Sequence, residues 1–309
     1  MIKKKNTNTP NNDFRVVAIV LSLFTVGVVL FLMHSRQKEQ RTITHVQKAP
    51  PIVETGDMYI PNENLKTVEP PVAVPIQPVP IERIPGSGGK IAIILDDWGQ
   101  SISNCKYLKE IPEPLAVSIL PGLRHTRDVA DCAGLNHKLA MLHLPLEAMH
   151  NFDFYPPDYV IKTTMSPQLV SKIVDDDLEQ LPTIEGVNNH MGSKATADKD
   201  LMRIILRKLR KKGLFFVDSM TSHYSVSAEL AEEMGLAYEK RDVFLDNINT
   251  REAIIKQFVI LAKEARRRGY AVAIGHDRHL TMQVIKDEIP LLEKQGFQIV
   301  SIKTLLKKK

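Results

Sequence analysis

A short apolar segment that runs directly into two carboxylates is the feature that most constrains how this chain folds. Residues 91–95 are all apolar, and Asp96, Asp97, Trp98 and Gly99 follow them. An unbroken apolar run of this length is typical of a strand buried on both faces, as in a parallel sheet. The carboxyl edge of such a sheet is where α/β folds place their sites. Because adjacent carboxylates repel each other, the pair indicates a cation or a shared proton at this edge.

Similar apolar runs recur between residues 90 and 305 and alternate with longer amphipathic stretches. We expect strands at 91–95, 115–120, 138–144, 186–189, 214–217, 237–244, 271–274 and 297–302. We expect helices at 166–181, 198–212, 227–234, 251–268 and 281–294. Seven or eight β/α units of this kind predict a parallel sheet covered by helices. A closed or nearly closed barrel fits the pattern, and an open doubly wound sheet fits the periodicity almost as well.

Capping residues mark the ends of several expected helices. Ser166 suits the N-cap of the helix at 166–181, and Pro167 suits its first position. A glycine separates a helical stretch from the next strand at five places, where we expect a left-handed C-cap: Gly134, Gly213, Gly235, Gly269 and Gly296.

The N-terminal part of the chain predicts a membrane anchor. Residues 16–33 carry no charge, and at about 1.5 Å per residue they would span roughly 27 Å of bilayer. No small-x-small cleavage site follows them, which disfavours a signal peptide. The basic residues at 1–15 predict a cytoplasmic tail. We therefore expect a single-pass protein of the inner membrane whose C-terminal domain lies on the periplasmic or extracytoplasmic side.

The segment 34–89 predicts a linker. It has little apolar periodicity, and nine of the chain's 19 prolines fall between Pro50 and Pro85. Such a composition is typical of an extended, semi-rigid spacer. A Pro-rich ligand for a partner domain is the alternative interpretation.

Charge and cysteine content bound the remaining possibilities. The formal net charge is +5, but residues 1–48 hold eight basic residues against two acidic ones, so the excess belongs to the N-terminal arm. The folded part is thus not a basic surface for nucleic acid, and we expect no nucleic-acid partner. Cys105 and Cys132 could pair in an oxidising compartment, although we expect two buried thiols.

Polar residues gather at the ends of the expected strands, which in a β/α barrel all point to one face. Among them are Asp96, Asp97, His143, Glu147, Asn189, His190, Asp218, Arg241, Asp242 and His276. One aspartate and two histidines suit zinc or a similar divalent ion with open coordination positions. A second carboxylate could act as a base and another histidine as an acid. This set suits hydrolysis of an amide or an ester.

Each of these residues also has a structural interpretation. An aspartate of the first pair could cap a helix, and His143 could be a satisfied core histidine. Asp218 could cap the helix that follows it, and Arg241, Asp242 and Asp246 could form a structural ion pair. No Gly-x-Ser-x-Gly motif surrounds Ser193 or Ser219, which disfavours a serine nucleophile.

The strand-end segments together resemble the divergent polysaccharide deacetylase family, a branch of the carbohydrate esterases related to chitooligosaccharide deacetylases. The segments that carry the resemblance are residues 93–99, 141–147, 186–193, 215–219, 241–247 and 274–276. The resemblance covers about residues 90–305. It implies a distorted seven-stranded β/α barrel and a location on the export side of the membrane.

The resemblance also implies roles for the strand-end residues. Asp96 matches the catalytic base, Asp97 and His143 match metal ligands, and His276 matches the general acid. The family motif offers a second histidine four residues after the first, whereas Glu147 stands there in this chain. We take His190, on the neighbouring strand end, as the third ligand. Residues that could contact the substrate or support the ligands are Trp98, Glu147, Asn189, Asp218, Arg241 and Asp242.

The expected function is that of a membrane-anchored, metal-dependent hydrolase that removes acetyl groups from an envelope polysaccharide or peptidoglycan, with zinc as the expected metal. Trp98 could then stack on a sugar ring or belong to the core. The missing second histidine keeps an alternative open, in which the domain is inactive and binds an envelope glycan or an envelope protein. A structural anchor that works through the Pro-rich spacer is a further hypothesis.

Overall fold

The computed structural model describes residues 88–150 and 159–306 of the 309-residue chain. Their strands are β1 (Gly89–Trp98), β2 (Ala116–Ile119), β3 (Leu139–Leu146), β4 (Gly186–Met191), β5 (Phe215–Asp218), β6 (Tyr238–Lys240), β7 (Val243–Phe244), β8 (Tyr270–His276) and β9 (Phe297–Ile299). Their helices are α2 (Cys105–Glu110), α3 (Thr126–Leu135), α4 (Pro167–Gln180), α5 (Lys199–Lys211), α6 (Ser227–Met234), α7 (Arg251–Arg268) and α8 (His279–Lys294), with 3-10 turns η2 (Ala195–Ala197) and η3 (Ile302–Thr304).

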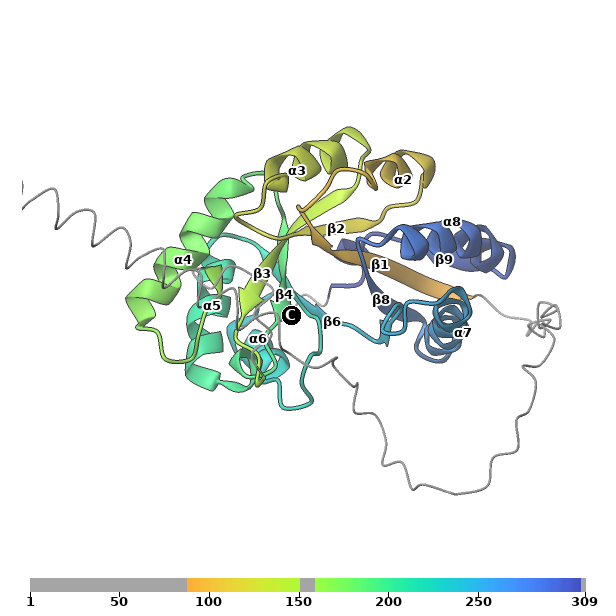
Figure 1. Ribbon diagram of the computed structural model, residues 1–309. Coiled ribbons are helices and arrows are strands. Elements are labelled where there is room, and N and C mark those ends of the chain that lie inside the picture. The colour runs from red at the N-terminus through yellow and green to blue at the C-terminus, as the bar shows by residue number, and fades with distance from the viewer. Residues whose placement is uncertain (1–87, 151–158, 307–309) are drawn as a thin grey trace, which may run out of the picture. The chain divides into compact units, whose positions relative to one another are not determined.

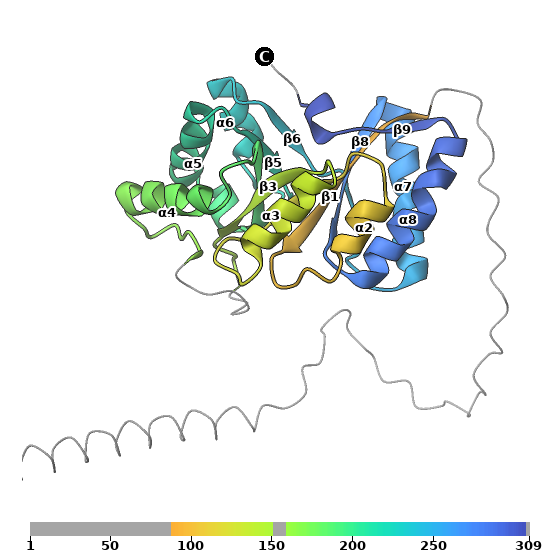
Figure 2. The same ribbon diagram turned by 90° about the horizontal axis from the view of Figure 1, so that it is seen from above.

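All the strands belong to one parallel sheet. Its order is β6-β5-β4-β3-β2-β1-β8-β7, and β9 pairs with the start of β1. The sheet is curved, and the helices lie on its outer side (Figures 1 and 2). The protein is therefore a parallel α/β half-barrel, in line with the barrel expected from the sequence.

Alternate residues of each strand enter two different apolar layers. Ile91, Ile93 and Leu95 of β1 lie in the large cluster that also contains helix residues. Ala92 and Ile94 lie in a smaller cluster on the other side of the sheet, closed by Ile302 and Leu305 near the C-terminus and by residues of β2, β3, β5 and β8. A strand buried on both faces explains why residues 91–95 are apolar without interruption.

Most of the expected elements are present, and the two exceptions are the expected strands 237–244 and 297–302. Each of the five expected helices corresponds to a helix within two residues at each end. The expected strand 237–244 is divided into β6, which pairs with β5, and β7, which pairs with β8. The expected strand 297–302 ends at Ile299, and Ile302 begins a 3-10 turn instead.

The divided strand brings the two edges of the sheet together. Only Arg241 and Asp242 separate β6 from β7. The Arg241 amide donates to the carbonyl of Asp218 at 2.9 Å, and the Asp242 amide donates to the carbonyl of Val272 at 2.9 Å. One segment thus turns from β5 to β8, so a single expected strand contributes to both edges of the sheet.

Four of the five glycines expected at helix ends have positive φ. These are Gly213 at 71°, Gly235 at 63°, Gly269 at 83° and Gly296 at 86°. The prediction of a left-handed C-cap at Gly134 is wrong, because α3 continues through Gly134, ends at Leu135 and has Asn136 as its C-cap. The side chain of Asn136 donates to the carbonyl of Cys132 at 2.8 Å, so an asparagine satisfies the end of this helix.

The expectation of two buried thiols is wrong, because Cys105 and Cys132 form a disulfide. Cys105 begins α2 and Cys132 lies in α3, and these helices pack together with the Cα atoms of the two residues 6.4 Å apart. This separation lies within the range that a disulfide spans. A sequence separation of 27 residues did not reveal the pairing, because the side-by-side packing of α2 and α3 brings the two residues together.

Reduction of this disulfide should lower the free energy of unfolding. Opening a loop that spans 27 residues costs about 3.5 kcal/mol in the chain-entropy model. At roughly 2–4 °C per kcal/mol, the melting temperature should fall by about 7–14 °C. Calorimetry with and without reductant, and of a Cys105→Ser/Cys132→Ser variant, measures this. Two titratable thiols in the unreduced, unfolded protein would contradict the pairing.

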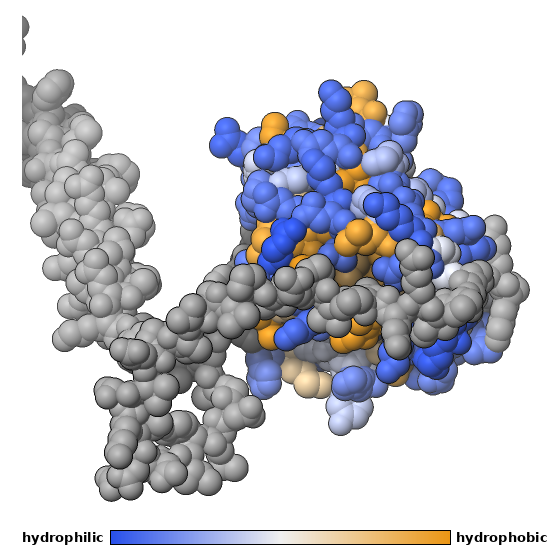
Figure 3. All heavy atoms as spheres, turned by 90° about the vertical axis from the view of Figure 1, so that its right-hand side faces the viewer, coloured by the Kyte–Doolittle hydropathy of each residue, from blue (hydrophilic) through white to orange (hydrophobic). Residues whose placement is uncertain are grey.

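The predicted tail at 1–15, the predicted span at 16–33 and all but the last residues of the predicted linker lie outside the described residues. Among the residues that the structure describes, no helix is long and apolar enough to cross a bilayer. On the side of the domain that carries α7 and α8, hydrophilic side chains cover much of the visible surface, with hydrophobic ones between them (Figure 3).

Candidate metal and catalytic site

The inner face of the sheet changes from apolar to polar at the carboxyl ends of its strands. Ala92 and Ile94 of β1 lie in the small inner cluster, and Asp96 is the next residue on the same face of the strand. On the neighbouring strand β8, His276 pairs in register with Asp96. The two-residue period of a strand therefore places ionisable side chains directly above an apolar floor.

A local distortion of β1 lets two successive aspartates serve the same site. Successive residues of a regular strand point to opposite faces, so Asp97 would point away from Asp96. However, Asp97 has a positive φ of 65°, and the pairing of β1 with β2 shifts register between Leu95 and Trp98. Aspartate tolerates this left-handed backbone better than most residues. The shift redirects the Asp97 carboxylate toward the histidines of β3 and β4.

Asp97, His143 and His190 present three ligand atoms to one another. Oδ1 of Asp97 lies 3.2 Å from Nε2 of His143 and 3.0 Å from Nδ1 of His190. The two histidine nitrogens are 3.2 Å apart. Within the described residues this is the one group of three or more such side chains that could hold a metal ion. His143 and His190 come from adjacent, parallel strands, where Pro145 pairs with His190.

The donor set fits a divalent cation. Oδ1 of Asp97 is buried and accepts no hydrogen bond from the described residues, although both imidazoles lie beside it. A buried carboxylate oxygen without a hydrogen-bond donor is costly unless a cation compensates it. One carboxylate and two imidazoles are ligands that zinc and similar divalent ions accept, with room left for water or substrate.

The two aspartates have opposite pKa shifts. Burial raises the pKa of Asp96 and outweighs the lowering by His143, His276 and the Asn188 amide. Burial also disfavours the charged form of Asp97, but the imidazoles of His143 and His190 outweigh it and lower its pKa well below the usual range. Asp97 is therefore the anion of the pair, whereas Asp96 takes up a proton more readily. This division matches a ligand and a base.

His276 lies on the other side of the aspartate pair and has a carboxylate partner of its own. Its Nε2 is 3.7 Å from Oδ2 of Asp97, and its Nδ1 is 2.8 Å from Oδ1 of Asp246. Burial lowers the pKa of His276, but Asp246, Asp97 and Asp96 together raise it above its ordinary value. Asp246 is fully buried and also accepts hydrogen bonds from the His276 amide at 3.0 Å and the Thr281 hydroxyl at 2.7 Å.

Two residues expected near the metal ligands have other contacts. Glu147, which stands where the family motif has a second histidine, lies 2.8 Å from the Lys194 ammonium and accepts two hydrogen bonds from Thr163, each of 2.7 Å. Asn189 accepts from the amide of Ser219 at 2.9 Å and donates to the carbonyl of Met191 at 2.7 Å. Both side chains hold loops together rather than facing the three ligand atoms.

Asp218 and Arg241 both form hydrogen bonds to the loop that follows β5. Asp218 accepts from the amide of Met220 at 2.7 Å and from the Ser225 hydroxyl at 2.5 Å, so it orders the loop after β5. Arg241 donates to the carbonyls of Ser219 at 2.7 Å and Met220 at 2.9 Å. Burial lowers the pKa of Arg241, and the nearby charge of Asp96 raises it but only partly offsets the burial.

Asp242 and Trp98 lie away from the ligand atoms. Asp242 pairs with Arg268 and accepts from the amide of Val272 at 2.9 Å, which is the structural ion-pair role that the sequence left open. Trp98 has no exposed surface and belongs to the large apolar cluster between sheet and helices. A side chain without exposed surface cannot stack on a sugar ring, so the core role considered for Trp98 is the one present.

No feature of the sequence indicated Ser118 as a residue of the site. The sequence predicted Asn188 as a turn residue or as part of a ligand and its support, and Asp246 as a possible member of an ion pair, without a specific role for either. The two-residue period could have found Asn188, because it lies two positions before His190 and therefore on the same face of β4. Ser118 of β2 faces the same interior and donates to Asn188. Asp246 follows β7 and could not be found by period, since β7 has only two residues.

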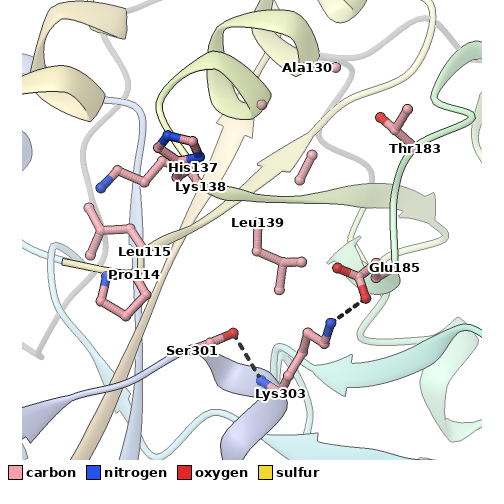
Figure 4. A pocket seen from close by; sticks show the side chains of 12 residues that line it. Pro114, Leu115, Ala130, His137, Lys138, Leu139, Thr183, Glu185, Ser301 and Lys303 are labelled. Atoms are coloured by element: carbon pink, nitrogen blue, oxygen red, sulfur yellow. Dashed lines mark hydrogen bonds and ion pairs between the residues drawn. The ribbon is translucent and has the colours of Figure 1, made fainter. Parts of the chain in front are cut away.

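A separate cavity of about 330 Å³ lies at the opposite edge of the sheet, where β2, β3 and β4 begin. Leu115, Leu139, Glu185, Ser301 and Lys303 line it, and Lys303 forms an ion pair with Glu185 (Figure 4). Asp97, His143, His190 and His276 are not part of its lining. The chemically equipped site is thus the carboxyl edge of the sheet and not this cavity.

Comparison with known proteins agrees with this fold. The sequence profile described as divergent polysaccharide deacetylase matches residues 93–306. Protein YibQ of Escherichia coli (strain K12) is 30% identical over 205 residues, which is 66% of this chain and 64% of YibQ. The match therefore spans slightly less than two thirds of that relative. A protein of Haemophilus influenzae is 32% identical over 197 residues, 64% of this chain and 70% of its own length.

A solved structure has the same fold. The crystal structure of ATU2773 from Agrobacterium tumefaciens C58 superimposes with a TM-score of 0.67 at 20% identity, and covers 72% of this chain and 91% of that one. At this identity the likeness concerns the fold.

Proposed function

Because this chain belongs to the divergent polysaccharide deacetylase family, we propose that it is a metal-dependent hydrolase that removes acetyl groups from an envelope glycan. The observation that carries the proposal is the convergence of Asp97, His143 and His190, whose ligand atoms lie 3.0–3.2 Å apart. Asp96 and His276 lie beside this group: Oδ2 of Asp96 is 3.7 Å from Nε2 of His143, and Nε2 of His276 is 3.7 Å from Oδ2 of Asp97.

The side chains divide the proposed reaction among them. Asp97, His143 and His190 would hold the ion, which supplies a Lewis acid that makes both water and an acetyl carbonyl more reactive. Asp96 accepts the proton of the attacking water, and its raised pKa suits a group that must take up a proton. His276 donates a proton to the nitrogen or oxygen that leaves the acetyl carbon, and Asp246 keeps that imidazole protonated and oriented.

The proposed location is the extracytoplasmic side of the inner membrane, with residues 16–33 as the anchor and zinc as the proposed metal. Two observations support the location. Residues 16–33 are long and apolar enough to span a bilayer. The disulfide between Cys105 and Cys132 is typical of proteins in oxidising compartments.

Acetate release tests the proposal. The zinc-loaded protein should release acetate from acetylated chitooligosaccharides or peptidoglycan fragments. Asp96→Asn should reduce the rate by about 10²–10⁴-fold, because it removes the general base and keeps the shape of the side chain. The melting temperature of the variant shows whether the fold is retained.

The same assay separates the proposal from a binding module. Glycan binding by calorimetry with no acetate release from any acetylated glycan would reject the hydrolase and leave a glycan-binding domain on the same half-barrel. Equal rates for the wild type and Asp96→Asn would reject the role of Asp96.

A further inference from the structure

Asn188 makes four hydrogen bonds in the middle of the site. Its Oδ1 lies 2.8 Å from Nδ1 of His143 and accepts a hydrogen bond from the Ser118 hydroxyl. Its Nδ2 donates to Oδ1 of Asp96 at 2.7 Å and to Oγ of Ser219 at 3.2 Å. The side chain has no exposed surface. An asparagine amide has two donor hydrogens and two acceptor lone pairs, so all of its capacity is used.

These four partners allow one orientation of the amide. In the reversed orientation the amide oxygen would face the Asp96 carboxylate, and two acceptors would lie against each other without a hydrogen between them. A buried polar group left unpaired in this way costs about 1–3 kcal/mol. Asp96 therefore fixes the amide with its NH₂ group toward the aspartate and its oxygen toward His143.

The fixed amide determines which nitrogen of His143 carries the proton. Because Oδ1 of Asn188 is an acceptor, Nδ1 of His143 must be the donor. Nε2 is then the nitrogen without a hydrogen in the neutral ring. This is the atom that lies 3.2 Å from Oδ1 of Asp97 and 3.2 Å from Nδ1 of His190. A lone pair at that position is what a metal ligand requires.

The same amide holds the carboxylate on the other side. Its NH₂ group binds Oδ1 of Asp96, while Oδ2 of Asp96 lies 3.7 Å from Nε2 of His143. A partial rotation of the carboxylate about its last bond would move this oxygen away from the NH₂ group and break the hydrogen bond. One buried side chain thus orients both the base and a ligand.

We propose that Asn188 is a positioning residue that couples the two halves of the site, selecting the metal-binding tautomer of His143 with its oxygen and orienting Asp96 with its amide nitrogen. The inference rests on the function proposed above. Asn188 supplies none of the three ligand atoms and is neither the base nor the acid of the proposed reaction.

Two substitutions separate the two roles. Asn188→Leu removes both, so the dissociation constant for zinc should rise by about 10–100-fold, as for other groups that orient a ligating histidine. Asn188→Asp keeps an acceptor for His143 but places a carboxylate oxygen against Asp96. Zinc affinity should then stay within about tenfold of the wild type, while acetate release falls by about 10²-fold or more.

A spectroscopic readout reports the tautomer directly. In metal-free, ¹⁵N-histidine-labelled protein, at an alkaline pH where the His143 ring is neutral, the wild type and Asn188→Asp should show Nδ1–H for His143, and Asn188→Leu should show the other tautomer or a mixture. His143→Gln assigns the resonances. Asn189→Leu is the matched control, because Asn189 lies one residue along the same strand and is equally buried on the other face. It should lower the melting temperature and leave zinc affinity and the His143 tautomer unchanged.

The results can overturn the inference independently of the function. If Asn188→Leu binds zinc as tightly as the wild type and keeps the Nδ1–H signal, Asn188 does not position His143. If Asn188→Asp releases acetate at the wild-type rate, it does not position Asp96. A wild type that releases no acetate, with zinc affinities and tautomers as expected, rejects the proposed hydrolase but upholds the role of Asn188 toward His143.

Discussion

Asp97→Ala should abolish stoichiometric zinc binding and reduce acetate release by about 10³-fold or more. Asp97 provides the single carboxylate of the three ligands, and its Oδ1 lies within 3.2 Å of both histidine nitrogens. Without it, two imidazoles remain, which is fewer protein ligands than a catalytic zinc site holds. A metal ion that acts as a Lewis acid lowers the activation free energy of such a reaction by several kcal/mol. About 4 kcal/mol corresponds to a factor of roughly 10³.

Elemental analysis of the purified protein measures the first effect, and the acetate assay measures the second. Glu147→Gln is the informative control, because Glu147 occupies the sequence position of the missing histidine, but its carboxylate contacts Lys194 and Thr163. It should retain one zinc per chain. Loss of zinc from Glu147→Gln together with full occupancy in Asp97→Ala would reject the ligand set proposed here.

The stability of Asp97→Ala should not fall in parallel with its activity. In metal-free protein Oδ1 of Asp97 is buried beside two imidazoles, whereas 37% of the side chain is exposed. Because the imidazoles outweigh burial and lower the pKa of Asp97, the carboxylate stabilises the metal-free fold, and its removal should lower the melting temperature. The difference from the wild type should be modest in metal-free protein and much larger in the presence of zinc.

The sequence predicts the fold wherever a strand or helix is long enough to show its period. The run at 91–95 predicted a doubly buried strand, and it is β1, an interior strand between β2 and β8. The sequence does not show that 237–244 contributes to two edges of the sheet, since a short extended segment has the same appearance whether it pairs with one neighbour or changes from one to another. Pairing partners are fixed by the closure of the sheet, which is a property of all the strands together.

The site residues divide in the same way. His276 ends β8, His190 is the last residue but one of β4, and His143 lies in the second half of β3. The rule that the carboxyl ends of parallel strands meet at one face predicted that these three residues lie together. Asn188 needed the additional step of counting by two from His190. Asp246 lies in a loop, and its pairing with His276 depends on β7 lying beside β8, which the sequence does not show. The disulfide was missed for a similar reason, because it depends on the packing of α2 against α3.

Asp246→Asn should move the alkaline limb of the pH–rate profile to lower pH. The general acid must be protonated, so activity falls as the pH rises through the pKa of His276. Burial lowers that pKa, but Asp246, Asp97 and Asp96 raise it above the ordinary value, and Asp246 makes the direct contact of 2.8 Å. An asparagine keeps an acceptor for Nδ1 and removes the charge. At alkaline pH the rate should fall by up to about 10²-fold, and at pH 6 it should change much less.

The same pair predicts a window of pH in which the variant loses stability. The pKa of His276 is raised in the folded state, so its contribution is present below about pH 6.5 and is lost as the pH rises through the folded pKa. Burial raises the pKa of Asp246, but His276 and Thr281 outweigh it and lower the pKa, so its contribution is present above about pH 3.9 and is lost in acid. The stability difference between wild type and Asp246→Asn should therefore be largest between about pH 4 and 6.5.

Thr281→Val distinguishes the charge of Asp246 from its packing. The Thr281 hydroxyl donates to Oδ2 of Asp246 at 2.7 Å, and valine removes this donor while leaving the carboxylate beside His276. A carboxylate with one donor fewer attracts the imidazolium more strongly, so the alkaline limb should stay in place or move upward, although the protein loses a buried hydrogen bond. A downward shift in Thr281→Val equal to that in Asp246→Asn would show that general loosening of this edge, and not the carboxylate, sets the protonation of His276.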